Sequence, residues 1–456
     1  MERNGRRETY AMCVYGSGLR VGGRRNKKSA NFGDMKVVHI NRADTGGGAA
    51  VAVQRIHAAL RKEGVESSML VLSKYSDEPN VEQYSDTTFG QMLNFANFVR
   101  ERLTILPHES HSSMRYNFSL ANTGVDVTTH HLVKEADIIH LHWINQGFIS
   151  FGGLKKLASL GKPIVWTLHD MWPFTGGCHY AGTCLEFNEH CGFCPYLKDA
   201  SRQDISAVEF KQKRELYSGM NLTVVSCSQW LNSLATCSAL FSKKRCLSIA
   251  NPIDLEVFKP MDRKEARRRL GLPEDKKLLL FGAAKITDLR KGFRYLVEAL
   301  RIISDSFPSV AKQMELVLFG LMKDDGLYDV SSNYKVHQMG FVSSTEQLVD
   351  LYNAADSFVL PSLQDNLPNT VVESMACGTP VVGFRIGGVP EMVDHERTGY
   401  LAEVKNSLSL ANGIYATLLF NTPEKRREVR SRAEKMFGEK QSAQQYKELY
   451  EQLLKK

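Results

Sequence analysis

The sequence of 456 residues is longer than one hydrophobic core usually organises, so it predicts two domains. Its 43% apolar and 24% charged residues are the proportions of an ordinary globular protein and exclude extensive disorder. Residues 1–34 hold eight Arg or Lys against three acidic residues, a balance of +5, which leaves +3 of the net +8 for the remainder. A body so close to neutral lacks the basic face that nucleic acids require, so no nucleic-acid partner is expected.

No segment approaches the roughly 18 uninterrupted apolar residues of a membrane span, and residues 1–34 lack the apolar core of a secretory signal. We therefore expect a cytoplasmic protein. Residues 1–34 show no hydrophobic periodicity, whereas MKVVHIN, which begins at Met35, is typical of the first strand of an α/β domain. Residues 1–34 are accordingly predicted to form a flexible tail.

Short apolar runs rich in Val and Ile recur from Met35 onward, and helical patterns follow them. Such runs are typical of parallel strands in a doubly wound sheet. A polar stretch at 251–262 separates two sets of runs and predicts a hinge between two Rossmann-like domains that face each other across a cleft. The first set comprises 37–41, 137–143, 163–168 and 222–228, and the second set comprises 278–284, 315–320, 336–342, 357–362 and 380–384.

The expected N-terminal domain covers residues 35–250 and carries a cysteine-rich loop at 171–197. The expected C-terminal domain covers residues 263–435, and a last helix, 436–456, is expected to pack back toward the N-terminal domain. In open α/β sheets ligands bind beyond the carboxyl ends of the strands. Polar residues that directly follow each apolar run are therefore the candidates for chemistry.

The most informative stretch is PSLQDNLPNTVVESMACGTPVVGFRIGGVPEMV, residues 361–393. Two acids, Asp365 and Glu373, flank an expected helix start, with Asn369 as its N-cap and Glu373 in the first turn off the apolar face. A helix N-terminus attracts a diphosphate, and a nearby carboxylate can accept hydrogen bonds from sugar hydroxyls. Taken alone, the acid pair is better explained by Glu373 as an exposed helix residue and Asp365 as a turn residue.

This segment resembles the donor-binding signature of glycosyltransferase family 4. The resemblance implies a retaining enzyme of the GT-B fold that uses a nucleotide diphosphate sugar as donor and needs no catalytic metal. It implies that Glu373 binds the donor ribose and that Asp365, where the family usually has Glu, contacts the donor sugar. The other positions with implied donor-binding roles are Asn366, Leu367, Asn369 and Thr370. The DNLPNT form itself resembles a subgroup devoted to exopolysaccharide, capsule and colanic-acid assembly.

A second matching element is FGAAKITDLRKGFRYL, a strand end followed by a basic loop and a helix. The resemblance places Lys291 on the donor diphosphate, where it would neutralise charge on the leaving group. The family usually has Arg directly after the strand-end Gly282, whereas this chain has two alanines there. We assign the second cation to Lys285, with Arg290 as its competitor. For the residues alone, a solvated surface loop is the alternative.

In the first domain, Gly46, Gly47 and Gly48 follow the strand at 37–41 and precede a helix. The resemblance makes them a glycine-rich loop that lines the cleft, although a tight strand-to-helix turn explains them equally well. His169 ends the strand at 163–168, and the resemblance gives it a catalytic role near the transferred sugar; a structural histidine is the alternative. Three neighbours are candidates for the acceptor pocket: His140, His142 and Asp170.

These residues together predict a hexosyltransferase that moves a sugar from a nucleotide diphosphate donor to a glycan or lipid-linked glycan acceptor in surface polysaccharide synthesis. The resemblance assigns the acceptor to the first domain and the donor to the second. No residue is an obvious nucleophile, so retention would proceed by front-face attack, with the leaving diphosphate taking the acceptor proton. Two alternatives stay open: another GT-B enzyme, such as a phosphorylase or epimerase, and a catalytically silent nucleotide-sugar-binding module.

The segment QMLNFANFVRERLTIL, residues 91–106, is predicted to be a helix of the first domain. It combines Leu93, Phe98 and Leu103 with Arg100 and Arg102, a combination that would suit peripheral contact with the inner face of the plasma membrane. Its apolar stripe is irregular, so a core helix with a solvated basic face is the favoured alternative.

Nine cysteines in a cytosolic chain are expected to be mostly reduced. Four of them, Cys178, Cys184, Cys191 and Cys194, lie within the polar, Gly-rich segment CHYAGTCLEFNEHCGFC. The two-residue spacing of CGFC suits a structural zinc site, with His179 and His190 as reserve ligands. A reduced thiol cluster and disulfides are the alternatives, because the spacing between Cys178 and Cys184 is wide.

Overall fold

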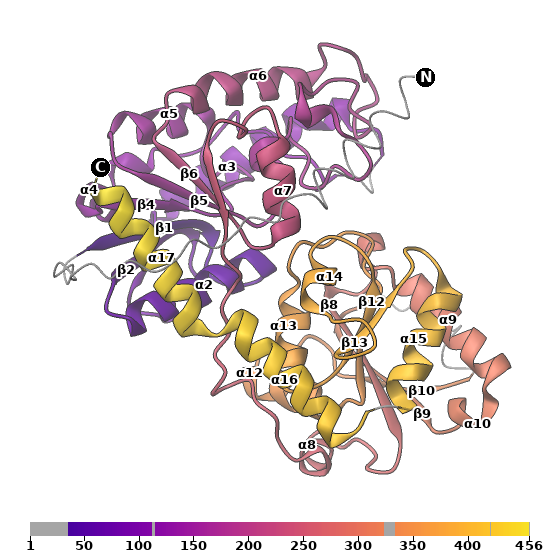
Figure 1. Cartoon of the computed structure of the whole chain (residues 1–456). Helices are drawn as coiled ribbons and strands as arrows, with labels where there is room; N and C mark the ends of the chain where they lie inside the picture. The colour runs from indigo at the N-terminus through magenta and orange to yellow at the C-terminus, as the bar shows by residue number, and fades with distance from the viewer. Residues whose placement is uncertain (1–34, 112–114, 323–332, 420, 456) are drawn as a thin grey trace. The chain divides into compact units, whose positions relative to one another are not determined.

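The computed structural model describes residues 35–111, 115–322, 333–419 and 421–455. The tail expected at residues 1–34 lies outside them. The described chain forms two compact units: residues 35–250 with 442–455, and residues 251–441. Each unit is built on its own parallel sheet with helices packed against it (Figure 1). The prediction of two Rossmann-like, doubly wound α/β domains is confirmed.

The described strands of the first unit form a seven-stranded sheet in the order β3-β2-β1-β4-β5-β6-β7, and each neighbouring pair is parallel. Successive residues of a strand face opposite sides of the sheet. Val38 and Ile40 therefore enter one hydrophobic core while Val37 enters the other, which explains why these strands are apolar throughout. The strands are β1 (Lys36–Ala43), β2 (Glu66–Ser73), β3 (Val81–Gln83), β4 (Ile138–Leu141), β5 (Ile164–Leu168), β6 (Leu222–Ser226) and β7 (Arg245–Ser248).

The helices of this unit connect the strands, and the last helix of the chain joins them. They are α2 (Gly48–Lys62), α3 (Thr88–Ile105), α4 (His131–Glu135), α5 (Phe151–Ser159), α6 (Ile205–Ser218), α7 (Gln229–Cys237) and α17 (Glu439–Leu454). In Figure 1 α17 is drawn in yellow close to α2 and β1. Three of its side chains, Tyr446, Leu449 and Tyr450, are buried against Val37 and Ile56, so the C-terminus of the chain completes this core.

The described strands of the second unit form a six-stranded sheet in the order β10-β9-β8-β11-β12-β13. They are β8 (Lys277–Lys285), β9 (Met314–Leu321), β10 (Lys335–Gln338), β11 (Ser357–Leu360), β12 (Val381–Phe384) and β13 (Gly399–Ala402). The helices are α8 (Arg263–Arg269), α9 (Phe293–Ser306), α10 (Pro308–Ala311), α12 (Thr345–Ala354), α13 (Asn369–Ala376), α14 (Val389–Met392), α15 (Ser407–Leu419) and α16 (Pro423–Phe437).

Both sheets reverse their winding direction once. The first unit winds outward from β1 to β3 and then resumes at β4 on the other side of β1; the second does the same at β8 and β11. Chain segments that leave two such neighbouring strands diverge, and the opening between them is where ligands bind in open α/β sheets. The fold therefore places one candidate site beyond β1 and β4 and another beyond β8 and β11.

All nine predicted strands are present. The run at 336–342 is shorter than predicted, because β10 ends at Gln338, just before Gly340 with a positive φ of 66°. Four described strands were not predicted: β2, β3, β7 and β13.

Helix α3 is not the core helix with a solvated basic face that the sequence analysis favoured. Its buried residues are Asn94, Glu101 and Ile105, whereas its large apolar side chains are exposed: Phe89 (77%), Met92 (66%), Leu93 (49%) and Leu103 (63%). The backbone N–H groups of Leu120 and Gly147 donate to the buried Glu101 carboxylate at 3.2 and 2.6 Å, which holds this polar side inward. The core-helix interpretation is therefore wrong.

We expect Leu449→Ala in α17 to lower the free energy of unfolding of the first unit by about 2 to 5 kcal/mol, because it removes a fully buried side chain from the core. All four tryptophans of the chain, Trp143, Trp166, Trp172 and Trp230, belong to that unit, so a urea titration followed by tryptophan fluorescence measures it selectively. Leu454→Ala, at an exposed position of the same helix, is the control and should change the free energy of unfolding by less than about 0.5 kcal/mol. Equal effects of the two variants would contradict the packing of α17 described here.

Candidate active site

Three loops meet at the carboxyl ends of β8, β11 and β12 in the second unit. The loop after β8 passes through a one-turn 3₁₀ helix, Leu289–Lys291, and reaches Gly292 with a positive φ of 68°. A Cβ atom on Gly292 would lie 1.9 Å from the carbonyl oxygen of Pro361, so only glycine lets this loop lie directly against the loop after β11. The N–H of Leu363 donates to the carbonyl of Arg290 at 2.8 Å and locks the two loops together.

An ion pair also joins the two loops. The Lys291 ammonium donates to the Asp365 carboxylate at 2.7 Å, and both side chains are mostly buried. Burial raises the pKa of Asp365, but the positive charges of Lys291 and Arg290 outweigh it and leave this pKa below its usual value. Asp365 is thus an ionised carboxylate beside two cations. The structure thus brings together residues from two separate sequence motifs.

The loop after β12 supports Asp365 from behind. Gly387 has a positive φ of 54°, and a Cβ atom there would lie 1.7 Å from the carbonyl oxygen of Asp365. The N–H of Gly388 donates to the carbonyl of Asn366 at 3.0 Å. Asn366 and Leu367 are themselves buried, so this part of the predicted donor site is held by the protein's own packing.

Helix α13 begins one residue earlier than predicted. Its N-cap is Pro368, which has no side-chain donor or acceptor, and Asn369 is the first helical residue rather than the cap. Glu373 consequently lies in the second turn and not the first. It is buried, with 6% of its surface exposed, and the Tyr352 hydroxyl donates to its carboxylate at 2.8 Å. The sequence analysis missed Tyr352, since nothing in its local pattern distinguishes it from a core aromatic.

Cations gather where this helix starts. Lys285 is exposed at the end of β8, Arg290 and Lys291 follow in the next loop, and Asn369 and Thr370 open α13 with partly buried side chains. A helix N-terminus carries partial positive charge and directs backbone N–H groups outward. Together these groups can bind a diphosphate without a metal ion.

The glycine-rich loop of the first unit is open to solvent. Gly46 has a positive φ of 88°, Gly47 caps α2 with extended backbone, and Gly48 is the first residue of the helix. A Cβ atom on Gly46 or Gly47 would meet no atom within 4 Å. The turn conformation therefore requires glycine at Gly46, while the space beside Gly47 leaves room for a ligand to approach the backbone.

A chain of imidazoles crosses three neighbouring strands of the first sheet. His39 Nδ1 lies 2.9 Å from His142 Nε2, and His142 Nδ1 lies 3.1 Å from His169 Nε2. His39 and His142 are fully buried, whereas His169, at the end of β5, is partly exposed. Burial lowers the pKa of His169 to about 4, against the opposing effect of the Asp170 charge. His169 is thus a neutral imidazole, oriented by its neighbour, that reaches the edge of the sheet.

Two of the predicted acceptor residues have structural roles instead. His140 is completely buried, and its two ring nitrogens lie 2.7 Å from the Thr167 and Tyr450 hydroxyls. No nitrogen of His140 remains to contact an acceptor, so that prediction is wrong. His142 is also buried, with both nitrogens engaged by imidazoles, and it can act only through His169.

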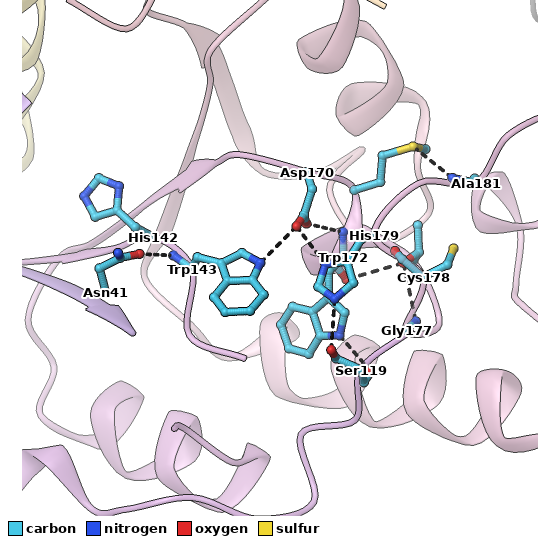
Figure 2. A network of polar contacts seen from close by, with 12 residues as sticks. Asn41, Ser119, His142, Trp143, Asp170, Trp172, Gly177, Cys178, His179 and Ala181 are labelled. Atoms are coloured by element: carbon cyan, nitrogen blue, oxygen red, sulfur yellow. Dashed lines mark hydrogen bonds and ion pairs between the residues drawn. The ribbon is translucent and has the colours of Figure 1, made fainter. Parts of the chain in front are cut away.

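Asp170 is the centre of the network in Figure 2. One carboxylate oxygen accepts from Trp143 Nε1 at 3.0 Å and from His179 Nδ1 at 2.7 Å, and the other accepts from the Trp172 backbone N–H at 2.9 Å. Burial raises the pKa of Asp170, but these donors together lower it. Asp170 therefore anchors the cysteine-rich loop to the end of β4, which corrects its predicted place in the acceptor pocket.

Among the described residues, two groups bring three possible ligand atoms within 4.8 Å of one another: His39, His140 and His142, and separately Glu82, His130 and His131. In the first group the nitrogens of His140 and His142 are already hydrogen-bonded. This group is therefore better described as a hydrogen-bonded histidine column. His39 was not predicted; a polar residue within the apolar run VVHIN was the available signal.

Comparisons with known proteins agree with this geometry. The model described as Glycosyltransferase Family 4 matches residues 46–257, and that described as Glycosyl transferases group 1 matches residues 275–419. A glycosyltransferase of Methanocaldococcus jannaschii is 32% identical over 302 residues, which cover 61% of this chain and 72% of that protein. The chain belongs to glycosyltransferase family 4. A D-inositol 3-phosphate glycosyltransferase of Arthrobacter sp. (strain FB24) is 24% identical over 387 residues, 83% of either protein.

Solved structures place this glycosyltransferase in the GT-B fold. Sucrose-phosphate synthase from Thermosynechococcus elongatus superposes with a TM-score of 0.64 at 18% identity, over 92% of this chain and 99% of that one. HepE from Anabaena, in complex with UDP-glucose, superposes with a TM-score of 0.59 at 18% identity, over 92% and 100% of the two chains. No helix in the described part of the glycosyltransferase is long and apolar enough to cross a membrane.

The buried histidines make the stability of the first unit depend on pH. Burial lowers the pKa of His57 to about 4 and holds the pKa values of His39, His140 and His142 well below 6.5. Between pH 6.5 and about 4 the unfolded chain binds protons that the folded unit does not, so stability falls as the pH falls through this window. Two buried acids act in the opposite sense, because burial raises the pKa of Glu101 to about 7 and that of Glu209 to about 8.

With the four histidines outnumbering the two acids, we expect the free energy of unfolding of the first unit to fall from pH 6.5 to pH 5. Replacing one of them, in His57→Gln, should reduce this slope by up to about 1.4 kcal/mol per pH unit, the value for one proton. Urea titrations at pH 7.5, 6.5, 5.5 and 5.0, followed by tryptophan fluorescence, measure it. His111→Gln, at an exposed position, is the control for the loss of a buried histidine. A wild-type stability that rises toward pH 5 would contradict this account.

Proposed function

We propose that this glycosyltransferase transfers a sugar from a nucleotide diphosphate donor with retention of configuration. The carrying observation is the cluster at the carboxyl ends of β8 and β11, where Lys291 is paired with Asp365 beside Arg290 and the start of α13. Such a site has positive charge for a diphosphate and an ionised carboxylate for sugar hydroxyls. The HepE complex with UDP-glucose supports the donor class by its fold and its ligand.

In this proposal Lys291 binds the diphosphate and stabilises the negative charge that builds on it as the glycosidic bond breaks. Lys285 supplies the second cation. Asp365 orients the donor sugar, and Glu373, whose carboxylate is held by Tyr352, binds the donor ribose. His169 stands near the transferred sugar as a neutral imidazole. The leaving diphosphate takes the acceptor proton, so no separate nucleophile and no metal ion is required.

Two acceptor classes are compatible with the comparisons. The relatives named D-inositol 3-phosphate glycosyltransferases point to a phosphorylated polyol. The DNLPNT form of the signature instead resembles enzymes of exopolysaccharide assembly, which points to a glycan or lipid-linked glycan. We favour the second, because the first unit exposes an apolar helix surface suited to a lipid-linked substrate.

This surface consists of Phe89, Met92, Leu93 and Leu103 of α3, all exposed, together with the exposed Arg100. These positions recur at helical spacing and form one stripe along the helix. An exposed apolar stripe with a basic residue is suited to the interface of an anionic bilayer. We propose that α3 rests on the membrane surface that carries the acceptor.

For the donor site, we expect Lys291→Ala to weaken the binding of UDP, GDP or ADP, whichever the wild-type protein binds, by about 10- to 150-fold. This corresponds to the roughly 1.5 to 3 kcal/mol of a charged hydrogen bond. Thermal shift over the three nucleotides identifies the base, and titration calorimetry measures the loss. The exposed Lys335→Ala on β10 is the control. Unchanged affinity in Lys291→Ala would mean that the diphosphate binds elsewhere.

A donor hydrolysis assay without acceptor separates a working enzyme from a silent binding module. We expect slow release of the free sugar in the configuration of the donor, as read by NMR. A protein that binds the nucleotide sugar but never hydrolyses or transfers it would be a binding module.

For the membrane surface, we expect the double variant Phe89→Asp/Leu103→Asp to reduce flotation with phosphatidylglycerol-containing vesicles by at least about tenfold, because it places two charges on the buried side of the contact. Leu408→Asp, at an equally exposed leucine of the second unit, is the matched control and should float like the wild type. A wild-type protein that fails to float with these vesicles would refute the contact.

A further inference from the structure

The connection between β5 and α6, residues 169–204, has little regular structure of its own. In the described chain it contains only two single-turn 3₁₀ helices, Trp172–Phe174 and Glu186–Asn188. Long segments without helix or strand are uncommon inside compact domains and need another source of order. The Asp170 network holds the beginning of this segment, but it does not reach the part beyond residue 181.

Four cysteines of this segment converge on one small cavity. Cys178, Cys184, Cys191 and Cys194 all line it, and its volume is about 20 Å³, enough for a single water-sized particle. Three of the four are buried, and the fourth, Cys184, is partly buried. All four thiols are free, so no disulfide accounts for their gathering.

Backbone N–H groups are directed at the sulfur atoms. The N–H of Gly176 donates to Cys191 Sγ at 3.1 Å. The N–H groups of Glu186 and Tyr196, each two residues beyond a cysteine, are likewise directed at the sulfurs of Cys184 and Cys194. Donors of this kind stabilise a thiolate more than a thiol, and they are the outer contacts that orient sulfur ligands around a metal ion.

A buried lysine lies beside the cysteine cluster. Lys213 is completely buried; its ammonium donates to the carbonyls of Trp172 and Thr175 at 2.6 and 3.0 Å. It is close enough to Cys178 and Cys191 to interact with both electrostatically. A tetrathiolate zinc centre carries a net charge of −2, and an adjacent ammonium stabilises it.

The reserve histidines are not available as ligands. His179 Nδ1 is bound to Asp170 at 2.7 Å, and its Nε2 lies 2.9 Å from the Ser119 hydroxyl. Figure 2 shows this ring turned toward Asp170 and Ser119, away from the neighbouring Cys178 side chain. His190 is exposed and does not line the cavity. Of the predicted ligands, only the four sulfurs remain.

We propose that Cys178, Cys184, Cys191 and Cys194 bind one structural Zn²⁺ in this cavity. The four sulfurs surround the cavity more widely than coordinated ligands do, since no three of them bring their ligand atoms within 4.8 Å of one another. Coordination of one tetrahedral ion, with Zn–S distances of about 2.3 Å, therefore requires the four side chains to turn inward about their χ1 angles. The site lies outside the donor-binding loops and takes no part in the chemistry.

Such an ion would add to the hydrogen bonds that hold the later part of the segment, such as the one from the Cys194 N–H to the Asp204 carboxylate at 2.9 Å. The proposed zinc site and the Asp170 network are adjacent, because Cys178 directly precedes His179 in the chain. Through Asp170, the ordered segment also borders His169, at the acceptor end of the proposed reaction. Loss of zinc would therefore destabilise the first unit, while nucleotide binding by the second unit would persist.

The test is metal analysis of the whole chain, purified without chelator and without a histidine tag. We expect about one zinc per chain, and less than about one tenth of that in Cys191→Ser/Cys194→Ser. Cys246→Ser, at a free and partly buried cysteine outside the cluster, is the matched control and should retain its zinc. Titration of Co²⁺ into the zinc-depleted wild type should produce the thiolate charge-transfer and visible bands of a tetrahedral site.

The wild-type measurements decide the question even if the double variant fails to fold. Native protein that contains no zinc and whose four thiols react freely with a thiol reagent would overturn the proposal. Two disulfides among the four cysteines, identified by mass spectrometry after alkylation, would also overturn it. Nucleotide affinity is measured independently in the second unit, so a failure of the zinc site and a failure of the proposed donor site are distinguishable.

Discussion

A parallel sheet must be covered on both faces, and much of this glycosyltransferase follows from that constraint. In the first unit, the strands carry apolar side chains toward two separate cores. The helices between consecutive strands do not complete the second core, and α17, from the far end of the chain, supplies Tyr446, Leu449 and Tyr450. Because parallel strands end at one edge, the same arrangement gathers the polar residues of distant motifs at the two places where the winding reverses.

The same constraint explains the polar residues inside the first unit. Four histidines enter the buried interior, where an unpaired ring nitrogen costs free energy. His140 is satisfied by hydroxyls of Thr167 and Tyr450, His142 by two imidazoles, and His57 by the Ser67 hydroxyl at 2.7 Å. The column continues to His169 at the sheet edge, so a residue of the candidate site is oriented by contacts that begin deep in the core.

The sequence could predict most strands with apolar runs, because burial on both faces leaves a clear pattern, although β2 was missed despite its buried run Met69–Leu72. It could not predict β7 or β13, since strands of four residues at a sheet edge bury too little to stand out. The resemblance assigned Lys291 and Asp365 to one donor site, but their direct pairing is visible only in the structure.

The errors share one cause: tertiary contacts that local patterns do not contain. Asn369 is a good cap by type, but Pro368 occupies that position. By its position near a strand end, His140 was predicted to contact the acceptor. Its actual partner, the hydroxyl of Tyr450, lies 310 positions further along the chain. Helix α3 has an apolar stripe that sequence rules assign to the core, whereas its polar side is the one that packs, around Glu101.

The route of the chain through the two units has a consequence for biosynthesis. The second unit lies between two parts of the first, and the chain returns to the first only at Ser442. During translation the second unit can therefore finish folding while the first still exposes the core surface that α17 covers. A chain cut short before α17 is complete leaves an apolar surface open on a domain synthesised long before, where chaperones or aggregation would act on it first.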